Sequence, residues 1–155
     1  MKKVFLCFIL AAIGFSVSAQ DKAAERSERV AQMKLELTKP EVKAATAEMT
    51  KLYELTPKQA DQMAKVQLRK LKNLADIAPL KESNKMTYFS KLRAIRLGVE
   101  ASTKRILTSR QMLTFNKLQE DRRIEESKLI KELKVKGLSR TEIRIAVIEK
   151  MEAVD

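Results

Sequence analysis

The chain contains no histidine and no tryptophan, and only one cysteine, three glycines and three prolines among 155 residues. Without histidine it lacks the usual general base near neutral pH, and a single cysteine excludes an intramolecular disulfide. The sequence also has no Gly-rich phosphate-binding loop. Few glycines and prolines beside abundant Ala, Leu, Lys, Glu, Arg and Met indicate helices rather than hairpin turns. We therefore predict an all-α protein that is not an enzyme.

The first nineteen residues have the pattern of a secretory signal peptide. Two lysines precede an apolar run at 4–15, and small residues up to Ala19 suit cleavage. The run is too short to span a bilayer comfortably. Cys7 lies inside it rather than near its end, which argues against a lipoprotein anchor. We expect cleavage after Ala19, a periplasmic location, and one helical domain over residues 20–155.

The positive charge of the chain, +12 in total, is concentrated in one stretch. Residues 57–106 contain twelve basic and four acidic residues, whereas residues 20–56 contain seven of each. A local field of this kind attracts acidic partners from a distance, and salt weakens it. Nucleic acid is the usual partner of a basic protein, but export and only two aromatics in the stretch argue against it. We therefore expect no nucleic acid partner.

Capping signals and apolar spacing predict six helices. Their approximate ranges are 21–36, 39–54, 57–78, 84–106, 109–136 and 140–153. The short segment 79–85 predicts that the third and fourth helices form an antiparallel hairpin. The fifth helix is apolar near both ends and polar between them, so we expect its middle to cross open solvent. Elongated hairpins in so small a chain leave apolar stripes uncovered, which predicts a homodimer with a shared core.

A five-residue phrase occurs four times, each time at a predicted helix start. The copies are residues 37–41, 55–59, 107–111 and 138–142. In each copy a Thr or Ser can accept the backbone N–H three residues on, where a Glu or Gln can bond back. The leading Leu can pack against the residue five positions later. The phrases therefore predict capping boxes, each with a hydrophobic staple.

Two copies have the strict form Leu-Thr-x-x-Gln, and they begin fifty-two residues apart. Their motif residues are Leu55, Thr56, Gln59, Leu107, Thr108 and Gln111. With a signal peptide and a small, basic, helical chain, this pair resembles the Spy/CpxP family of periplasmic proteins, whose signature is a pair of LTxxQ motifs. The resemblance covers roughly residues 55–123, and we expect the six motif residues to hold the frame of the fold.

The resemblance implies an ATP-independent periplasmic chaperone, a holdase for unfolded or partly folded envelope proteins. Such proteins are curved antiparallel dimers of helical hairpins that bind clients on a basic, partly apolar face. In this chain the basic hairpin would attract clients and its apolar positions would contact them. The residues expected to bind clients are Lys65, Arg69, Lys72, Lys91, Arg93, Arg96, Met63, Val66 and Leu92. Taken singly, each is better explained as ordinary core or solvated surface, but the excess positive charge of the stretch as a whole favours binding.

Other partners are compatible with the same residues. The resemblance also implies an envelope-stress adaptor that docks on a sensor kinase and modulates its signalling. A basic hairpin would suit an acidic sensor domain or an anionic membrane surface as well as it suits clients. A purely structural envelope protein is a third hypothesis.

We expect no metal and no cofactor. The family includes metal-responsive members, but this chain has no histidine and no cysteine after residue 19. Carboxylates at Glu120, Asp121, Glu125 and Glu126 are interspersed with arginine and lysine, which is typical of a charged helix surface.

Overall fold

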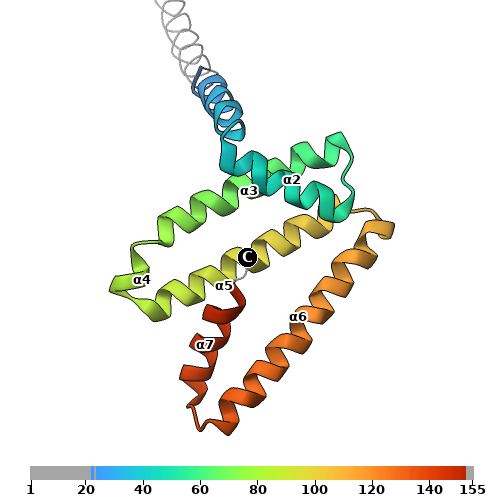
Figure 1. Ribbon diagram of the computed structural model, residues 1–155. Coiled ribbons are helices and arrows are strands. Elements are labelled where there is room, and N and C mark those ends of the chain that lie inside the picture. Colours follow the sequence, from blue (N-terminus) through green and yellow to red (C-terminus); the bar gives the residue numbers. More distant parts are fainter. Residues whose placement is uncertain (1–21, 23, 153–155) are drawn as a thin grey trace, which may run out of the picture. The chain divides into compact units, whose positions relative to one another are not determined.

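The computed structural model describes residues 22 and 24–152, and this part of the chain is all-helical, without a strand (Figure 1). The all-α prediction is confirmed. The predicted signal peptide and the cleavage site after Ala19 lie outside the described residues. Contacts divide the chain into one unit that ends at Lys39, in which residues 24–37 are helical, and a second that begins at Pro40. No helix among the described residues is long and apolar enough to cross a bilayer.

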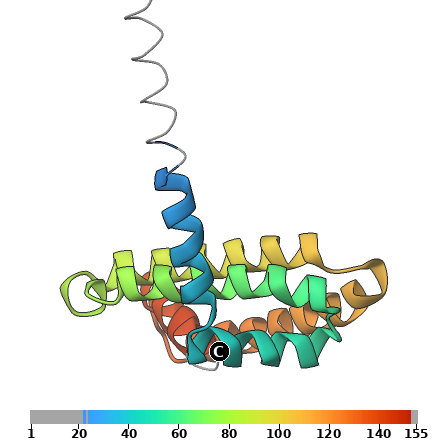
Figure 2. The ribbon, with the colours of Figure 1, turned by 90° about the horizontal axis from the view of Figure 1, so that it is seen from above.

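The second unit contains six helices among its described residues. They are α2 (Pro40–Tyr53), α3 (Pro57–Ile77), α4 (Leu80–Ser83), α5 (Lys85–Ile106), α6 (Ser109–Val135) and α7 (Arg140–Glu152). Their bounds follow the predicted ones closely, apart from α4, a single turn in a segment expected to be a loop. Helices α3 and α5 lie side by side, α2 packs on α3, and α7 packs on both α5 and α6 (Figure 2).

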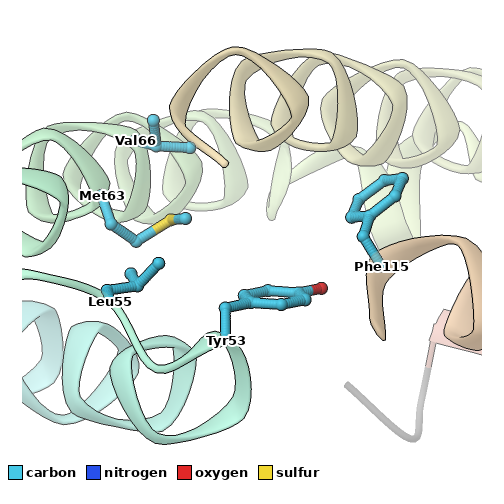
Figure 3. Close-up of a cluster of buried hydrophobic side chains, with 5 residues drawn as sticks. All are labelled: Tyr53, Leu55, Met63, Val66 and Phe115. Atoms are coloured by element: carbon cyan, nitrogen blue, oxygen red, sulfur yellow. The ribbon is translucent and has the colours of Figure 1, made fainter. Parts of the chain in front are cut away.

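The unit has two separate hydrophobic clusters. The first, cluster 1, consists of Tyr53, Leu55, Met63, Val66 and Phe115, which come together from α2, α3, α6 and the turn before α3 (Figure 3). The second, cluster 2, consists of Leu129, Ile143 and Val147, from α6 and α7. Helix α6 contributes to both, and none of its residues between 115 and 129 is buried. The polar middle predicted for this helix therefore lies outside both clusters.

Two of the residues predicted to contact clients belong to this core. Met63 is fully buried and Val66 is 7% exposed, so neither can contact a client, and the prediction is wrong for both. The reason is that α3 packs against α2 as well as α5, so its broad apolar arc covers two neighbours. Apolar spacing shows that a face is hydrophobic, but it does not show what covers that face. Leu92 is only half-buried.

The turn between α2 and α3 contains a left-handed residue. Glu54 has φ 52°, and the backbone N–H of Leu55 donates to the carbonyl oxygen of Thr50 at 3.1 Å. This is the Schellman arrangement, here with Glu in place of the usual Gly. The turn directs Leu55 into cluster 1 and leaves the Glu54 carbonyl oxygen able to accept another bond.

Candidate functional site

The two Leu-Thr-x-x-Gln motifs form the capping boxes that the sequence predicts. At the start of α3 the Thr56 hydroxyl accepts from the backbone N–H of Gln59 (3.4 Å), and the Thr56 N–H donates to the Gln59 side-chain oxygen (3.0 Å). At the start of α6 the corresponding bonds join Thr108 and Gln111, at 3.4 and 2.9 Å. Each box therefore satisfies backbone donors that the first turn of a helix leaves unpaired.

The two boxes are also bonded to each other. The Gln59 amide nitrogen lies 2.8 Å from the Gln111 side-chain oxygen, and the Gln111 amide nitrogen lies 3.2 Å from the Gln59 side-chain oxygen. The same nitrogens donate to the backbone before the opposite motif, Gln59 to the carbonyl of Ile106 (2.8 Å) and Gln111 to that of Glu54 (3.1 Å). The arrangement is reciprocal, since both carbonyls belong to the residue immediately before a motif leucine.

This network, the glutamine clasp, joins the start of α3 to the start of α6. Gln59 is 9% exposed, and both its oxygen and its nitrogen are occupied by hydrogen bonds. The staple leucines flank the clasp: Leu55 is buried in cluster 1, and Leu107 packs against that cluster. The clasp therefore fixes where two long helices begin, and its bonding groups are directed at the protein itself rather than at a ligand.

The other two phrases differ from each other. At the start of α7 the Ser139 N–H donates to the Glu142 carboxylate (2.8 Å), and the Glu142 N–H donates to the Ser139 hydroxyl (3.3 Å). The predicted box is present there. At Thr38 the hydroxyl instead donates to the carbonyl of Leu35 (2.6 Å), and α2 begins two residues later at Pro40. The prediction of Thr38 as N-cap is wrong, because its hydroxyl bonds to the preceding turn.

The box at Ser139 gives stability a pH dependence. Hydrogen bonds from the Ser139 side chain, and then from its backbone, hold the pKa of Glu142 below the ordinary value of 4.5. A lowered folded-state pKa contributes stability above the unfolded-state pKa, and this contribution is lost as pH falls through the folded-state value. Glutamine at this position keeps the cap but cannot titrate. At pH 7 we expect the free energy of unfolding to be larger for the wild type than for the Glu142→Gln variant. This difference should disappear towards pH 3. Denaturant unfolding across this range checks it, and a constant difference would contradict it.

A groove of about 950 Å³ lies between α5, α6 and α7, and we call it the cationic groove. Its charged lining consists of six basic residues and one carboxylate. These are Arg93, Arg96, Arg122, Lys134, Arg140, Arg144 and Glu126. The apolar lining includes Ile130, Leu138, Ile143, Val147, Ile148 and Met151. The groove therefore combines a strong positive field with apolar surface.

Two contacts organise the basic side chains of this groove. Arg96 forms an ion pair with Glu100 one turn further along α5, at 2.6 Å, and both side chains are about four-fifths buried. The Arg122 guanidinium donates to the carbonyl of Met151 at 3.1 Å and so joins α6 to the end of α7. By contrast, Arg140 and Arg144 are exposed on α7. Arg93 on α5 and Lys134 on α6 are exposed as well, so four cations of the groove are accessible to a partner.

The predicted cationic residues do not gather on one face. Arg93 and Arg96 line the cationic groove. Arg69 instead borders a smaller hollow of about 220 Å³ between α3 and α5, and its guanidinium donates to the Ser102 hydroxyl at 2.7 Å. The remaining three, Lys65, Lys72 and Lys91, are exposed.

The part of the groove that α6 and α7 supply was not predicted from the sequence. Arg140 and Arg144 fall in a segment with eleven basic and nine acidic residues. The small net charge of this segment therefore did not indicate a basic surface. A helical wheel of α7 would have placed both arginines on one side, four residues apart and next to the apolar stripe.

No protein-family model, curated protein or solved structure matches this chain. Within the described residues no group of potential ligands is arranged to hold a metal ion.

Proposed function

We propose that this protein is a periplasmic, ATP-independent holdase that binds unfolded or partly folded envelope proteins. The observation that carries the proposal is the cationic groove, which places six basic side chains beside six apolar ones. Unfolded chains present acidic and apolar residues together, and the groove offers a complement to both. The exposed lysines of α3 and α5, Lys65, Lys72 and Lys91, would add long-range attraction.

The chemistry of the groove suits weak binding to many sequences. Arginine and lysine can lay their methylene stems along apolar segments while their charged ends stay in water. The thioether of Met151 adds a contact that adapts to different shapes. The six Leu-Thr-x-x-Gln motif residues, whose glutamines form the glutamine clasp, are proposed to hold the frame rather than to touch clients. Membership of the Spy/CpxP family is proposed on the two motifs and their spacing, together with the predicted signal peptide and the small, basic, helical chain.

We also propose that the chain works as a homodimer of antiparallel helical hairpins. Helices α3 and α5, joined through α4, supply one such hairpin. Support for the dimer comes from large apolar side chains left exposed on the surface, among them Leu97, Leu113 and Val135. In a protein of this size such side chains are most simply covered by a second copy.

Reversing the two exposed arginines that α7 supplies to the groove tests the holdase. We expect Arg140→Glu combined with Arg144→Glu to raise at least tenfold the amount of protein needed to suppress aggregation of an acidic unfolded client. The matched control is Lys43→Glu with Lys51→Glu, which changes net charge equally on exposed α2 positions. Light scattering without ATP, at two salt concentrations, measures suppression, and high salt should weaken the wild type.

The outcomes separate the hypotheses. Suppression by wild type and control, but not by the groove variant, supports binding of clients in the cationic groove. Equal suppression by all three proteins would remove the groove from the mechanism. No suppression by wild type would overturn the holdase and favour the adaptor that docks on an acidic sensor domain, which predicts one saturable partner.

A further inference from the structure

Two arginine side chains converge on one buried hydroxyl between α3 and α5. The guanidinium of Arg69 donates to the Ser102 hydroxyl oxygen at 2.7 Å, and that of Arg105 donates to the same oxygen at 3.4 Å. Ser102 is 7% exposed, and its own proton is donated to the carbonyl oxygen of Gly98 at 2.8 Å. The two donating nitrogens are therefore at most about 6 Å apart.

The positive charges of this pair are not neutralised by nearby carboxylates. Within the described residues neither guanidinium forms an ion pair. The residues three and four positions before and after Arg69, Ser102 and Arg105 share their helix faces, and none of them is acidic. Residues 62–75 of α3 contain no acidic residue, and the one carboxylate of α5, Glu100, is already paired with an arginine. Two like charges this close repel, so an anion between them would be stabilising.

Both guanidinium groups have donors left for a ligand, and there is space beside them. A guanidinium has five N–H donors, and both side chains are exposed. Next to Arg69 lies the hollow of about 220 Å³ between α3 and α5, which Lys70 and Asn73 also line. Among the described residues no carboxylate lines it. Gly98 borders the same hollow, and a Cβ there would meet nothing within 4 Å.

We propose that Arg69 and Arg105 bind one phosphate group, whose oxygens accept hydrogen bonds from both guanidinium groups. The planar guanidinium matches the oxygen geometry of a phosphate, and bonds between ionised partners are stronger than neutral ones. Ser102 is a positioning residue, because its oxygen holds both arginines while its proton stays with the backbone. Lys70 adds positive charge at the hollow.

This phosphate site is separate from the cationic groove. Ser102 is nine residues from Arg93, and Arg105 is nine residues from Arg96, so each lies on the opposite side of α5 from an arginine of the groove. The inference therefore goes beyond the holdase and does not depend on it. A free phosphate ion and the phosphate of a lipid headgroup share the same chemistry, so the experiment has one arm for each source.

The first arm is isothermal titration calorimetry of the full-length chain with inorganic phosphate, at an ionic strength held constant with chloride. Wild type should bind one phosphate per chain, and Arg69→Gln and Arg105→Gln should each weaken binding at least tenfold. Arg123→Gln removes an equal charge at an exposed position of α6 and should bind as wild type does. Ser102→Ala keeps the charge and should weaken binding at least threefold, and circular dichroism confirms that each variant is helical.

The second arm is flotation with vesicles of phosphatidylcholine containing phosphatidate. Vesicles of phosphatidylcholine alone measure any binding by the apolar run at 4–15. Flotation that Arg69→Gln and Arg105→Gln abolish, and Arg123→Gln keeps, would assign a lipid headgroup, whereas calorimetric binding without flotation would assign the free ion.

An affinity that is the same in wild type and in both site variants, or that falls equally in Arg123→Gln, would show an adventitious ion only and overturn the proposal. Wild type that binds in neither arm overturns it as well. Neither arm contains a client, so failure here leaves the aggregation assay as a separate test of the holdase.

Discussion

Phe115→Ala is expected to lower the free energy of unfolding by about 3–5 kcal/mol, the usual cost of removing a buried aromatic ring. Phe115 is 2% exposed and is the residue that α6 contributes to cluster 1. Its ring centroid lies 6.3 Å from that of Tyr53, and the Lys104 ammonium lies 5.4 Å from it. Truncation would remove all of these contacts and leave a cavity between α2, α3 and α6.

Denaturant unfolding followed by helical circular dichroism measures this effect. The matched control is Met86→Ala, which removes a large apolar side chain that is 43% exposed on α5, and we expect it to cost less than about 1 kcal/mol. Equal midpoints for Phe115→Ala and the control would show that α6 does not pack on cluster 1. If Phe115→Ala loses all of its helix, the milder Phe115→Leu variant can be used to measure the size of the effect.

Gln59→Ala is expected to lower the free energy of unfolding by about 2–3 kcal/mol. The side chain accepts from the Thr56 N–H, donates to the carbonyl of Ile106, and bonds to Gln111 in both directions. Alanine would leave these partners without a bond in a part-buried site, where each unsatisfied group costs about 1–3 kcal/mol before relaxation. The loss therefore exceeds that of an ordinary N-cap, which is worth about 1 kcal/mol.

A double-mutant cycle separates the clasp from two independent caps. If Gln59 and Gln111 act together, the double alanine variant should lose less unfolding free energy than the two single variants lose in sum. We expect the difference to be at least about 0.5 kcal/mol. Gln62→Ala is the control, since this glutamine is exposed on the same helix and should change stability by no more than about 0.5 kcal/mol. Strict additivity would show that the two boxes cap their helices separately.

Local signals in the sequence predicted the helices well, because each signal acts within a few residues. The Thr56, Thr108 and Ser139 boxes each involve a residue and its neighbour three positions on, and the helices begin where these boxes predict. Thr38 was the exception, because its hydroxyl had a competing partner in the preceding turn. The single-turn helix α4 was missed because four residues carry too little periodicity to detect.

Burial was less predictable than helix position. The arc of apolar residues on α3 was apparent from the sequence, but its assignment to clients failed at Met63 and Val66 because α2 covers it. Likewise, composition located positive charge on residues 57–106 but missed Arg140 and Arg144, which join Arg93 and Arg96 only in the folded chain. A net charge per segment averages over helix faces and so conceals where the charges point.

By itself, the sequence determined the helical class and where α3, α6 and α7 begin, because propensity and capping are local properties of the chain. Only the tertiary structure decided that the two Leu-Thr-x-x-Gln motifs bond to each other, and that α5, α6 and α7 enclose a cationic groove. Contacts between residues tens of positions apart depend on how helices cross and which faces they bury. These choices are set by the packing of the whole unit and not by any one segment.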